Sequence, residues 1–306
     1  MRLINQNLRW GYPDVLEWEW NFDKYVREQT KTDFVLAPAV FSFGHLRDGQ
    51  LKDERVVYLC LEEPNGFFIP TTHSVYEFED RLQRILTICP FTRDWGNKRN
   101  GEEKRKYVWI PYPEDKIPPQ VEKDIPAAYV GNLFNGETGI YAKAAKDAGG
   151  VSISLQAGPL ITHVHLKFAE KMQLLARSKV AIVHNLLFFD GAHMNTIHNH
   201  PGDLLRDNRA FERGDKEGIA PQLKTRIFES AFSGCLLLCR RDPWNLIEDW
   251  FPADEFVYFD TPKLDETLRD VLNNWKDYAP IAERARQRAL KNYTCEHFFE
   301  KYLRGE

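Results

Sequence analysis

The sequence predicts an α/β protein in which buried strands alternate with amphipathic helices around parallel sheets. From residue 127 onward, short apolar runs alternate regularly with segments of helical periodicity, as in successive βαβ units. The length of 306 residues is sufficient for two compact lobes. The contents of 43% hydrophobic and 28% charged residues are typical of an ordered globular chain.

The first lobe is expected to comprise residues 1–118. The run from Arg55 to Leu61 is its strongest strand signal, and the charged segment 96–106 is expected to be a solvated loop. The expected elements are helices at 14–29 and 75–84 and strands at 33–38, 55–61 and 85–89.

The second lobe is expected to comprise residues 119–292, with a linker of acids, lysines and prolines at 114–125. Residues 187–220 show no clear periodicity, which indicates either a functional loop or a disordered segment. Residues 293–306 are expected to form a helix that packs back on the first lobe. The expected strands are 127–132, 151–155, 179–184, 235–239 and 255–259, and the expected helices are 138–148, 165–176, 222–233, 243–250, 262–275 and 279–291.

Composition excludes several classes of protein. The net charge of −4 argues against binding of nucleic acid through bulk electrostatics, so an anion site has to be local. The first ten residues show no apolar h-region and no small-residue cleavage site, and no apolar run is long enough to span a membrane, so we expect a cytoplasmic enzyme. The cysteines lack the spacing of a zinc or redox pair and are expected to be buried thiols.

The segment from Lys224 to Gly234 has the features of an anion-binding helix start. A helix beginning near Gln222 presents free backbone N–H groups, which favour a phosphate group. Lys224 and Arg226 add positive charge, and the Glu229 carboxylate, one turn later, can accept hydrogen bonds from ribose hydroxyls. On spacing alone, a surface helix with an Arg–Glu pair explains the segment equally well.

The run from Arg226 to Leu238 resembles the donor-site helix of GT-B glycosyltransferases, with a basic residue, a Phe-Glu pair, a glycine and an apolar strand. The similarity covers about residues 125–303. It implies two Rossmann-like lobes facing a cleft, with C-terminal helices. It also implies transfer of a hexose or deoxyhexose from a nucleotide-diphosphate donor to a glycan or other hydroxyl acceptor. By this resemblance, Lys224 or Arg226 contacts the diphosphate and Glu229 contacts the ribose.

Two further features refine the resemblance. The run from Tyr129 to Leu133 is similar to the strand and turn that open the donor lobe, so Gly131 and Asn132 are expected to contact the donor. Many retaining members carry a glutamate eight residues before the ribose-binding one, but Pro221 occupies that position, which favours inversion. No Asp-x-Asp motif is present, so no metal or other cofactor is expected.

An inverting transferase needs a general base for the acceptor hydroxyl. The segment from Leu61 to Pro64 resembles the Glu-x-Pro segment of inverting fucosyltransferase-like enzymes, which implies that Glu62 is the base. Glu63 beside it and His45, which follows the preceding strand, are the other candidates. These residues can equally be solvated loop acids and a turn-capping histidine.

His184 and Asn185 end a strand that is expected to face the cleft, so they are further candidates for donor contacts. Two other functions stay open. Paired histidines can bind zinc, so the His163/His165 and His198/His200 pairs allow a metal-dependent hydrolase, with His193, Asp190 or Asp203 completing the site. The chain can also be a catalytically silent relative that only binds a nucleotide.

Overall fold

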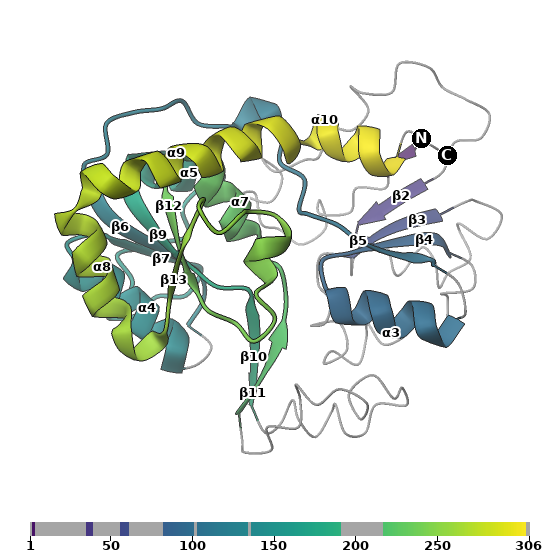
Figure 1. Cartoon of the computed structure of the whole chain (residues 1–306), viewed down its shortest axis with the longest axis horizontal. Helices are drawn as coiled ribbons and strands as arrows, with labels where there is room; N and C mark the ends of the chain where they lie inside the picture. Colours follow the sequence, from purple (N-terminus) through teal and green to yellow (C-terminus); the bar gives the residue numbers. More distant parts are fainter. Residues whose placement is uncertain are drawn as a thin grey trace.

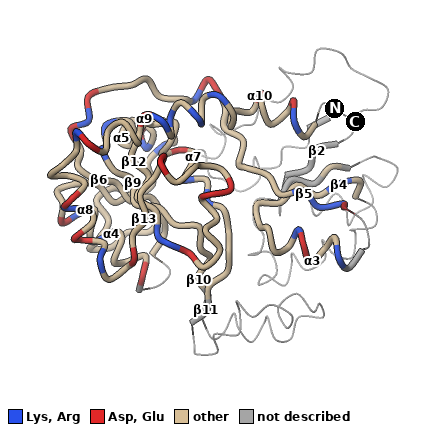
Figure 2. Tube along the Cα trace, viewed as in Figure 1, with Lys and Arg blue, Asp and Glu red and all other residues tan. Residues whose placement is uncertain are grey.

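The computed structural model describes residues 2–3, 35–38, 56–60, 82–100, 103–133, 136–190 and 217–303. It has two lobes, each built around a parallel sheet, as the α/β prediction requires (Figure 1). Basic and acidic residues are interspersed along the outer helices of the larger, second lobe (Figure 2). Within these ranges, no helix is both long and apolar enough to cross a membrane.

The second lobe contains a six-stranded parallel sheet in the order β13-β12-β9-β6-β7-β8. The order runs outward in both directions from the neighbouring strands β6 and β9, which is the doubly wound arrangement of the Rossmann fold. The strands are β6 (Ile125–Val130), β7 (Val151–Ser154), β8 (His163–Val164), β9 (Ser178–Val183), β12 (Leu236–Arg240) and β13 (Val257–Phe259).

Helices cover both faces of this sheet (Figure 1). On β9, Val180 and Ile182 belong to one buried cluster, and Ala181 and Val183 belong to the other. Strands buried on both faces read as continuous apolar runs, which explains why the sequence shows them so clearly. One face carries α4 (Gly136–Asp147) and α8 (Leu264–Asn273), and the other carries α5 (Phe168–Arg177) and α7 (Thr225–Phe232). The long helix α9 (Trp275–Asn292) contributes buried residues to both clusters.

The described part of the first lobe contains a five-stranded parallel sheet in the order β1-β2-β3-β4-β5. The helix expected at 75–84 is wrong over its last residues, because Leu82 begins a strand. The spacing of Leu82, Ile85 and Leu86 imitates a helix face, but pairing with β3 and β5 on either side determines the structure. The strands are β1 (Arg2–Leu3), β2 (Val35–Pro38), β3 (Val56–Cys60), β4 (Leu82–Thr87) and β5 (Arg105–Tyr107).

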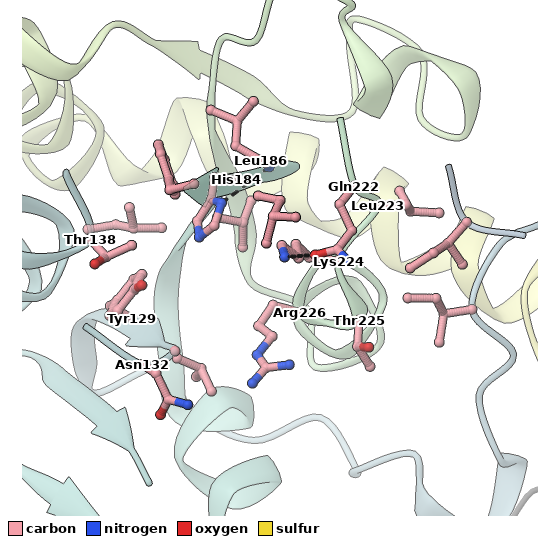
Figure 3. Close-up of a pocket in the computed structure, with 18 residues that line it drawn as sticks. Tyr129, Asn132, Thr138, His184, Leu186, Gln222, Leu223, Lys224, Thr225 and Arg226 are labelled. Atoms are coloured by element: carbon pink, nitrogen blue, oxygen red, sulfur yellow. Dashed lines mark hydrogen bonds between the residues drawn. The ribbon is translucent and has the colours of Figure 1, made fainter. Parts of the chain in front are cut away.

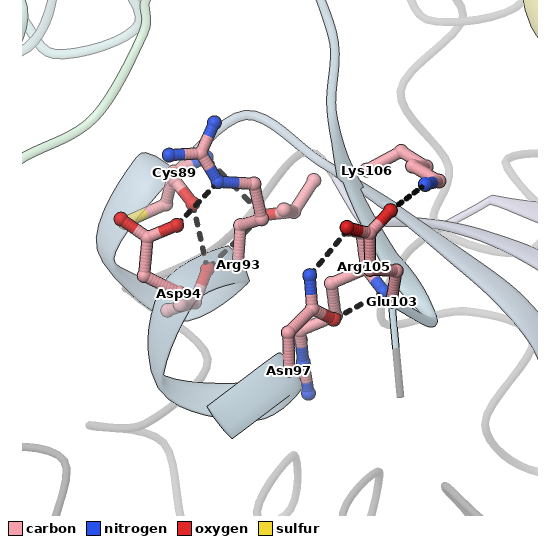
Figure 4. Close-up of polar contacts among 9 residues, drawn as sticks. Cys89, Arg93, Asp94, Asn97, Glu103, Arg105 and Lys106 are labelled. Carbon is pink, nitrogen blue, oxygen red and sulfur yellow. Dashed lines mark hydrogen bonds and ion pairs between the residues drawn. The ribbon is translucent and has the colours of Figure 1, made fainter. Parts of the chain in front are cut away.

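The solvated loop expected at 96–106 is also wrong. Helix α3 (Pro90–Asn100) occupies the first part, and β5 occupies the last part. The Asn97 amide joins them, because its Nδ2 donates to the Arg105 carbonyl at 3.0 Å and its Oδ1 accepts from the Arg105 N–H at 2.7 Å (Figure 4). Arg105 is fully buried despite its charged surroundings in the sequence.

An antiparallel hairpin of β10 (Leu186–Asp190) and β11 (Glu217–Pro221) projects from the second lobe (Figure 1). Its strands form the two ends of the 187–220 segment, for which the sequence shows no periodicity. Residues 191–216 lie outside the described ranges. The hairpin matters for function because its base lies beside the end of β9.

The C-terminal segment returns to the first lobe (Figure 1). The Cys295 N–H donates to the Tyr112 carbonyl at 2.8 Å, and the Trp109 ring lies 5.7 Å from that of Phe298 and 5.0 Å from that of Tyr302. The segment consists of α10 (Cys295–Phe298) and a π-helical turn (Phe299–Leu303).

Several helix boundaries differ from the sequence prediction. The helix expected from His165 begins three residues later, because His165 adopts a left-handed φ of 53°. The helix expected at 243–250 is reduced to one 3-10 turn. The 3-10 turns are Glu114–Lys116, Leu246–Asp249 and Thr261–Lys263. The expected burial of cysteines holds for Cys89, Cys235, Cys239 and Cys295, which are buried and form no disulfide with one another.

Candidate functional site

The candidate site lies at the point where the strand order of the second sheet reverses. Strands β6 and β9 are parallel neighbours, with Tyr129 opposite Ile182, so their carboxyl ends lie together. Gly131 follows β6 and His184 follows β9. In open α/β sheets, ligands bind outside the strand ends at this switch point. The topology thus brings together two candidates that are more than fifty residues apart in the sequence.

A cavity of about 280 Å³ opens at these strand ends (Figure 3). Ile88 and Ile110 of the first lobe line one side, so the cavity lies between the lobes. Five of the predicted donor contacts line it, namely Gly131, Asn132, His184, Lys224 and Arg226.

A second cavity of about 240 Å³ adjoins the first around Arg226. It is less polar, and its walls include Ile153, Leu155, Leu166 and Phe168. The predicted ribose contact, Glu229, lines this second cavity only. The residues common to both cavities are Val130, Gly131, Asn132, Thr225 and Arg226.

Helix α7 points its N-terminus at the boundary between the cavities. It begins at Thr225 rather than near Gln222, because Lys224 has the extended backbone of an N-cap residue, with φ −105° and ψ 137°. The Thr225 and Arg226 N–H groups therefore belong to the first turn and lack intrahelical acceptors. Residues 227–232 are all buried, which fixes the helix firmly against the sheet. The charged side chains of Lys224 and Arg226 therefore lie directly at the N-terminus of the helix.

Asn185 forms hydrogen bonds with the backbone that leads into helix α7. Its Oδ1 accepts the Lys224 N–H at 3.2 Å, and its carbonyl accepts the Gln222 N–H at 3.0 Å. Asn185 is fully buried and does not line either cavity. The structure thus places it behind the site, holding the backbone that carries Lys224.

Arg226 lines both cavities, and Figure 3 shows its side chain in the first of them. Its guanidinium forms no ion pair within the described part of the chain. Lys224 lies beside it, with its ammonium in contact with the Gln222 side chain. A guanidinium at a helix N-terminus is suited to bind phosphate oxygens, because its planar N–H groups and the free backbone N–H groups can bind the same anion.

Glu229 forms a buried ion pair one turn further along α7. Its Oε1 lies 2.8 Å from the Lys171 Nζ, and the two side chains are only 4% and 16% exposed. Burial alone raises the pKa of Glu229, but the charges of Lys171 and Arg226 outweigh it and lower the pKa. The carboxylate is therefore ionised, and its Oε2 has no hydrogen-bond partner among the described residues.

His184 is half-buried in the wall of the first cavity. Burial, followed by the charges of Lys224 and Arg226, lowers the pKa of His184 to about 3. The neutral ring accepts the Leu186 N–H on Nδ1 at 3.3 Å, which leaves the proton on Nε2. His184 can thus donate one hydrogen bond to an anionic or hydroxyl group without adding charge.

This shift predicts a pH dependence of stability. Between its unfolded pKa of about 6.5 and its folded pKa of about 3, His184 takes up a proton only in the unfolded state. The contribution of the neutral His184 to the free energy of unfolding is therefore complete above pH 6.5 and is lost as the pH falls towards 3. Replacing His184 by Gln is expected to reduce the loss of unfolding free energy between pH 7 and pH 5 by up to about 2 kcal/mol. Urea titrations of the wild type and H184Q at pH 7 and pH 5 measure the two losses of unfolding free energy. Equal losses in the two proteins would contradict the prediction.

Gly131 and Asn132 form the floor between the cavities. A Cβ on Gly131 would lie 2.7 Å from the Tyr129 hydroxyl, so the turn requires a glycine. The Asn132 Oδ1 accepts from the Ser154 hydroxyl at 2.9 Å and from the Leu155 N–H at 3.2 Å. Asn132 therefore ties the end of β6 to the end of β7.

The candidate general bases lie elsewhere in the chain. Glu62, Glu63 and His45 are outside the described residues, and their roles stay predictions. The same holds for His193, His198, His200 and Asp203. His163 contacts the Thr162 hydroxyl through Nδ1 at 2.8 Å. In the described ranges, no three His, Cys, Asp or Glu side chains are grouped in a way that could hold a metal ion.

Sequence reasoning did not identify Lys171 or the two isoleucines of the first lobe as parts of the site. Lys171 lies on an ordinary amphipathic helix, 58 residues before its partner Glu229. No local pattern distinguishes it from other helix-surface lysines. Ile88 and Ile110 look like any other apolar residues at the ends of buried runs.

Comparisons with known proteins agree with this architecture. Residues 158–304 match a family model described as glycosyl transferase-like. No curated protein sequence matches the chain. Several solved structures of GT-B glycosyltransferases share this fold at very low sequence identity.

Three of these structures illustrate the likeness. TarM of S. aureus, solved with UDP, gives a TM-score of 0.55 at 9% identity over 92% of this chain, which spans only 57% of TarM. HepE of Anabaena, solved with UDP-glucose, gives a TM-score of 0.53 at 10% identity, covering 87% of this chain and 76% of HepE. A trehalose 6-phosphate synthase of Burkholderia multivorans gives a TM-score of 0.52 at 7% identity, covering 88% of this chain and 70% of the synthase. The chain thus has the GT-B fold, and its residues 158–304 match the glycosyl transferase-like family.

Proposed function

We propose that this chain is a glycosyltransferase that moves a sugar from a nucleoside-diphosphate donor to a hydroxyl acceptor. The observation that carries the proposal is the arrangement at the start of α7. Arg226, which forms no ion pair within the described ranges, and two first-turn N–H groups meet a cavity at the switch point. The buried Glu229 carboxylate follows one turn later, with only one of its oxygens paired among the described residues. This arrangement fits a diphosphate joined to a ribose.

The donor would lie across both cavities. The diphosphate contacts Arg226, Lys224 and the first-turn amides of α7, and the ribose hydroxyls donate to the Glu229 Oε2. The apolar walls of the second cavity then accommodate the base, and the sugar lies in the first cavity near His184. Because HepE and TarM were solved with uridine nucleotides, UDP is the first nucleotide to test.

The proposed reaction is a direct displacement with inversion at the anomeric carbon. The acceptor oxygen forms a bond to this carbon as the bond to the diphosphate oxygen breaks, and a general base takes the acceptor proton. Lys224, Arg226 and the helix N-terminus stabilise the departing diphosphate without a metal ion. We propose residues 1–118 as the acceptor side, with Glu62 as the first candidate base and Glu63 and His45 as the others.

A thermal-shift screen with UDP, GDP, dTDP and CMP tests the proposal. At 100 times its dissociation constant, a bound nucleotide stabilises the folded state by about 2.7 kcal/mol. For a chain of this size, we expect UDP or GDP to raise the melting temperature by about 5 °C. If none of the four nucleotides raises it, the proposed function is wrong. Binding without sugar transfer to any acceptor would instead support a catalytically silent relative.

A further inference from the structure

The buried Lys171–Glu229 pair connects two helices at the wall of the second cavity. Lys171 lies on α5 and Glu229 on α7, and both line this cavity. The Lys171 Nζ also lies 4.5 Å from the centre of the Phe168 ring, which is another wall residue. These contacts fix the lysine in one place, and its ammonium in turn fixes the Glu229 Oε1.

The pair is asymmetric. Oε1 is occupied by the lysine at 2.8 Å, whereas Oε2 is buried without a hydrogen-bond partner among the described residues. Leaving a charged, buried oxygen unpaired is costly, and Glu229 is one of the residues that line the second cavity, so a ligand bound in this cavity can complete the carboxylate. Burial by itself disfavours a charged carboxylate here, and the neighbouring cations are needed to keep it ionised.

We propose that Lys171 is a positioning residue for the donor: it holds Glu229 charged and oriented so that Oε2 can accept the hydroxyls of a ribose. This inference rests on the proposed function. It adds that recognition of the ribose depends on a lysine of a different helix. Lys171 itself donates to Glu229 and not to the nucleotide.

The test compares UDP with 2′,3′-dideoxy-UDP, which lacks both hydroxyls, by isothermal titration calorimetry. Four proteins are used: the wild type, K171M, K171R and K167M. Lys167 is the matched control, because it is an exposed lysine one turn earlier on the same chain segment. If the screen selects GDP, the guanosine pair replaces the uridine pair.

The wild type is expected to bind UDP at least 10-fold more tightly than the dideoxy compound. In K171M this preference is expected to fall below about threefold, while the affinity for the dideoxy compound stays within about twofold of the wild type. K167M should behave like the wild type. K171R should keep most of the preference, because a guanidinium can still pair with Oε1.

A pH series separates positioning from a structural role. Without the ammonium, burial raises the pKa of Glu229, so the UDP affinity of K171M is expected to fall between pH 8 and pH 6. The wild-type affinity should stay constant over this range. If K171M does not fold, the comparison of K171R with the wild type carries the test, and a K171R protein that folds but shows no preference overturns the inference.

Failure of the proposed function can be distinguished from failure of the inference about Lys171. A wild type that binds none of UDP, GDP, dTDP and CMP defeats the proposed function, and the inference with it. A wild type that binds UDP and its dideoxy analogue equally well overturns the inference alone. A folded K171M protein that retains the wild-type preference also overturns it.

Discussion

Replacing Glu229 with alanine is expected to lower the free energy of unfolding by about 3 kcal/mol. The substitution leaves the Lys171 side chain, which is 16% exposed in the wild-type structure, without its only ion-pair partner in the described ranges. Removing one member of a buried pair is costly because the other charge stays desolvated. Guanidinium chloride unfolding of the wild type and E229A measures the difference.

Asp124 provides the matched control. It pairs with Arg177 on the same helix as Lys171, but both side chains are about half exposed. Because exposed pairs are screened by solvent, D124A should lower the free energy of unfolding much less than E229A does. The double variant K171M/E229L removes both charges and should recover much of the lost stability. An E229A protein as stable as D124A would show that the pair is not desolvated as described.

Replacing Arg226 with alanine is expected to weaken nucleotide-diphosphate binding by about 10- to 100-fold. The guanidinium has no ion pair in the described part of the chain, so its loss removes phosphate contacts without breaking a structural one. The unfolding free energy should therefore stay within about 0.5 kcal/mol of the wild type. Titration calorimetry with UDP and urea unfolding measure the two quantities.

The control for this variant is R269A, which removes an exposed arginine from α8 on the outer surface. It should leave the affinity unchanged, and R226K should fall between the two, because lysine keeps the charge but loses the bidentate geometry. If R226A binds UDP as well as R269A does, the diphosphate does not lie at the start of α7.

The fold of the second lobe was predictable because its strands are buried on both faces. The runs at 179–184 and 235–239 are almost entirely apolar, and each lies within a residue of the strand that forms. The first lobe was less predictable. The charged stretch after Cys89 forms α3 because Asn97 binds the backbone of Arg105, which is a tertiary contact that periodicity does not reveal.

The site was predictable only in part, because tertiary contacts again leave no local pattern in the sequence. Arg226, Glu229 and Gly131 lie in local patterns that resemble a known family, and the structure brings all three to adjoining cavities. Asn185 has the expected place after β9, but its side chain faces the backbone of Lys224. Lys171 carries no local signal, because its role arises from the packing of α5 against α7.

A crystal structure of the wild-type protein with UDP tests the central claim most directly. We expect the diphosphate to lie within hydrogen-bond distance of the Arg226 guanidinium and the first-turn amides of α7. We also expect the ribose hydroxyls to donate to the Glu229 Oε2 and the base to lie in the cavity beside Phe168. A nucleotide bound away from α7, or a ribose that makes no contact with Glu229, would contradict it.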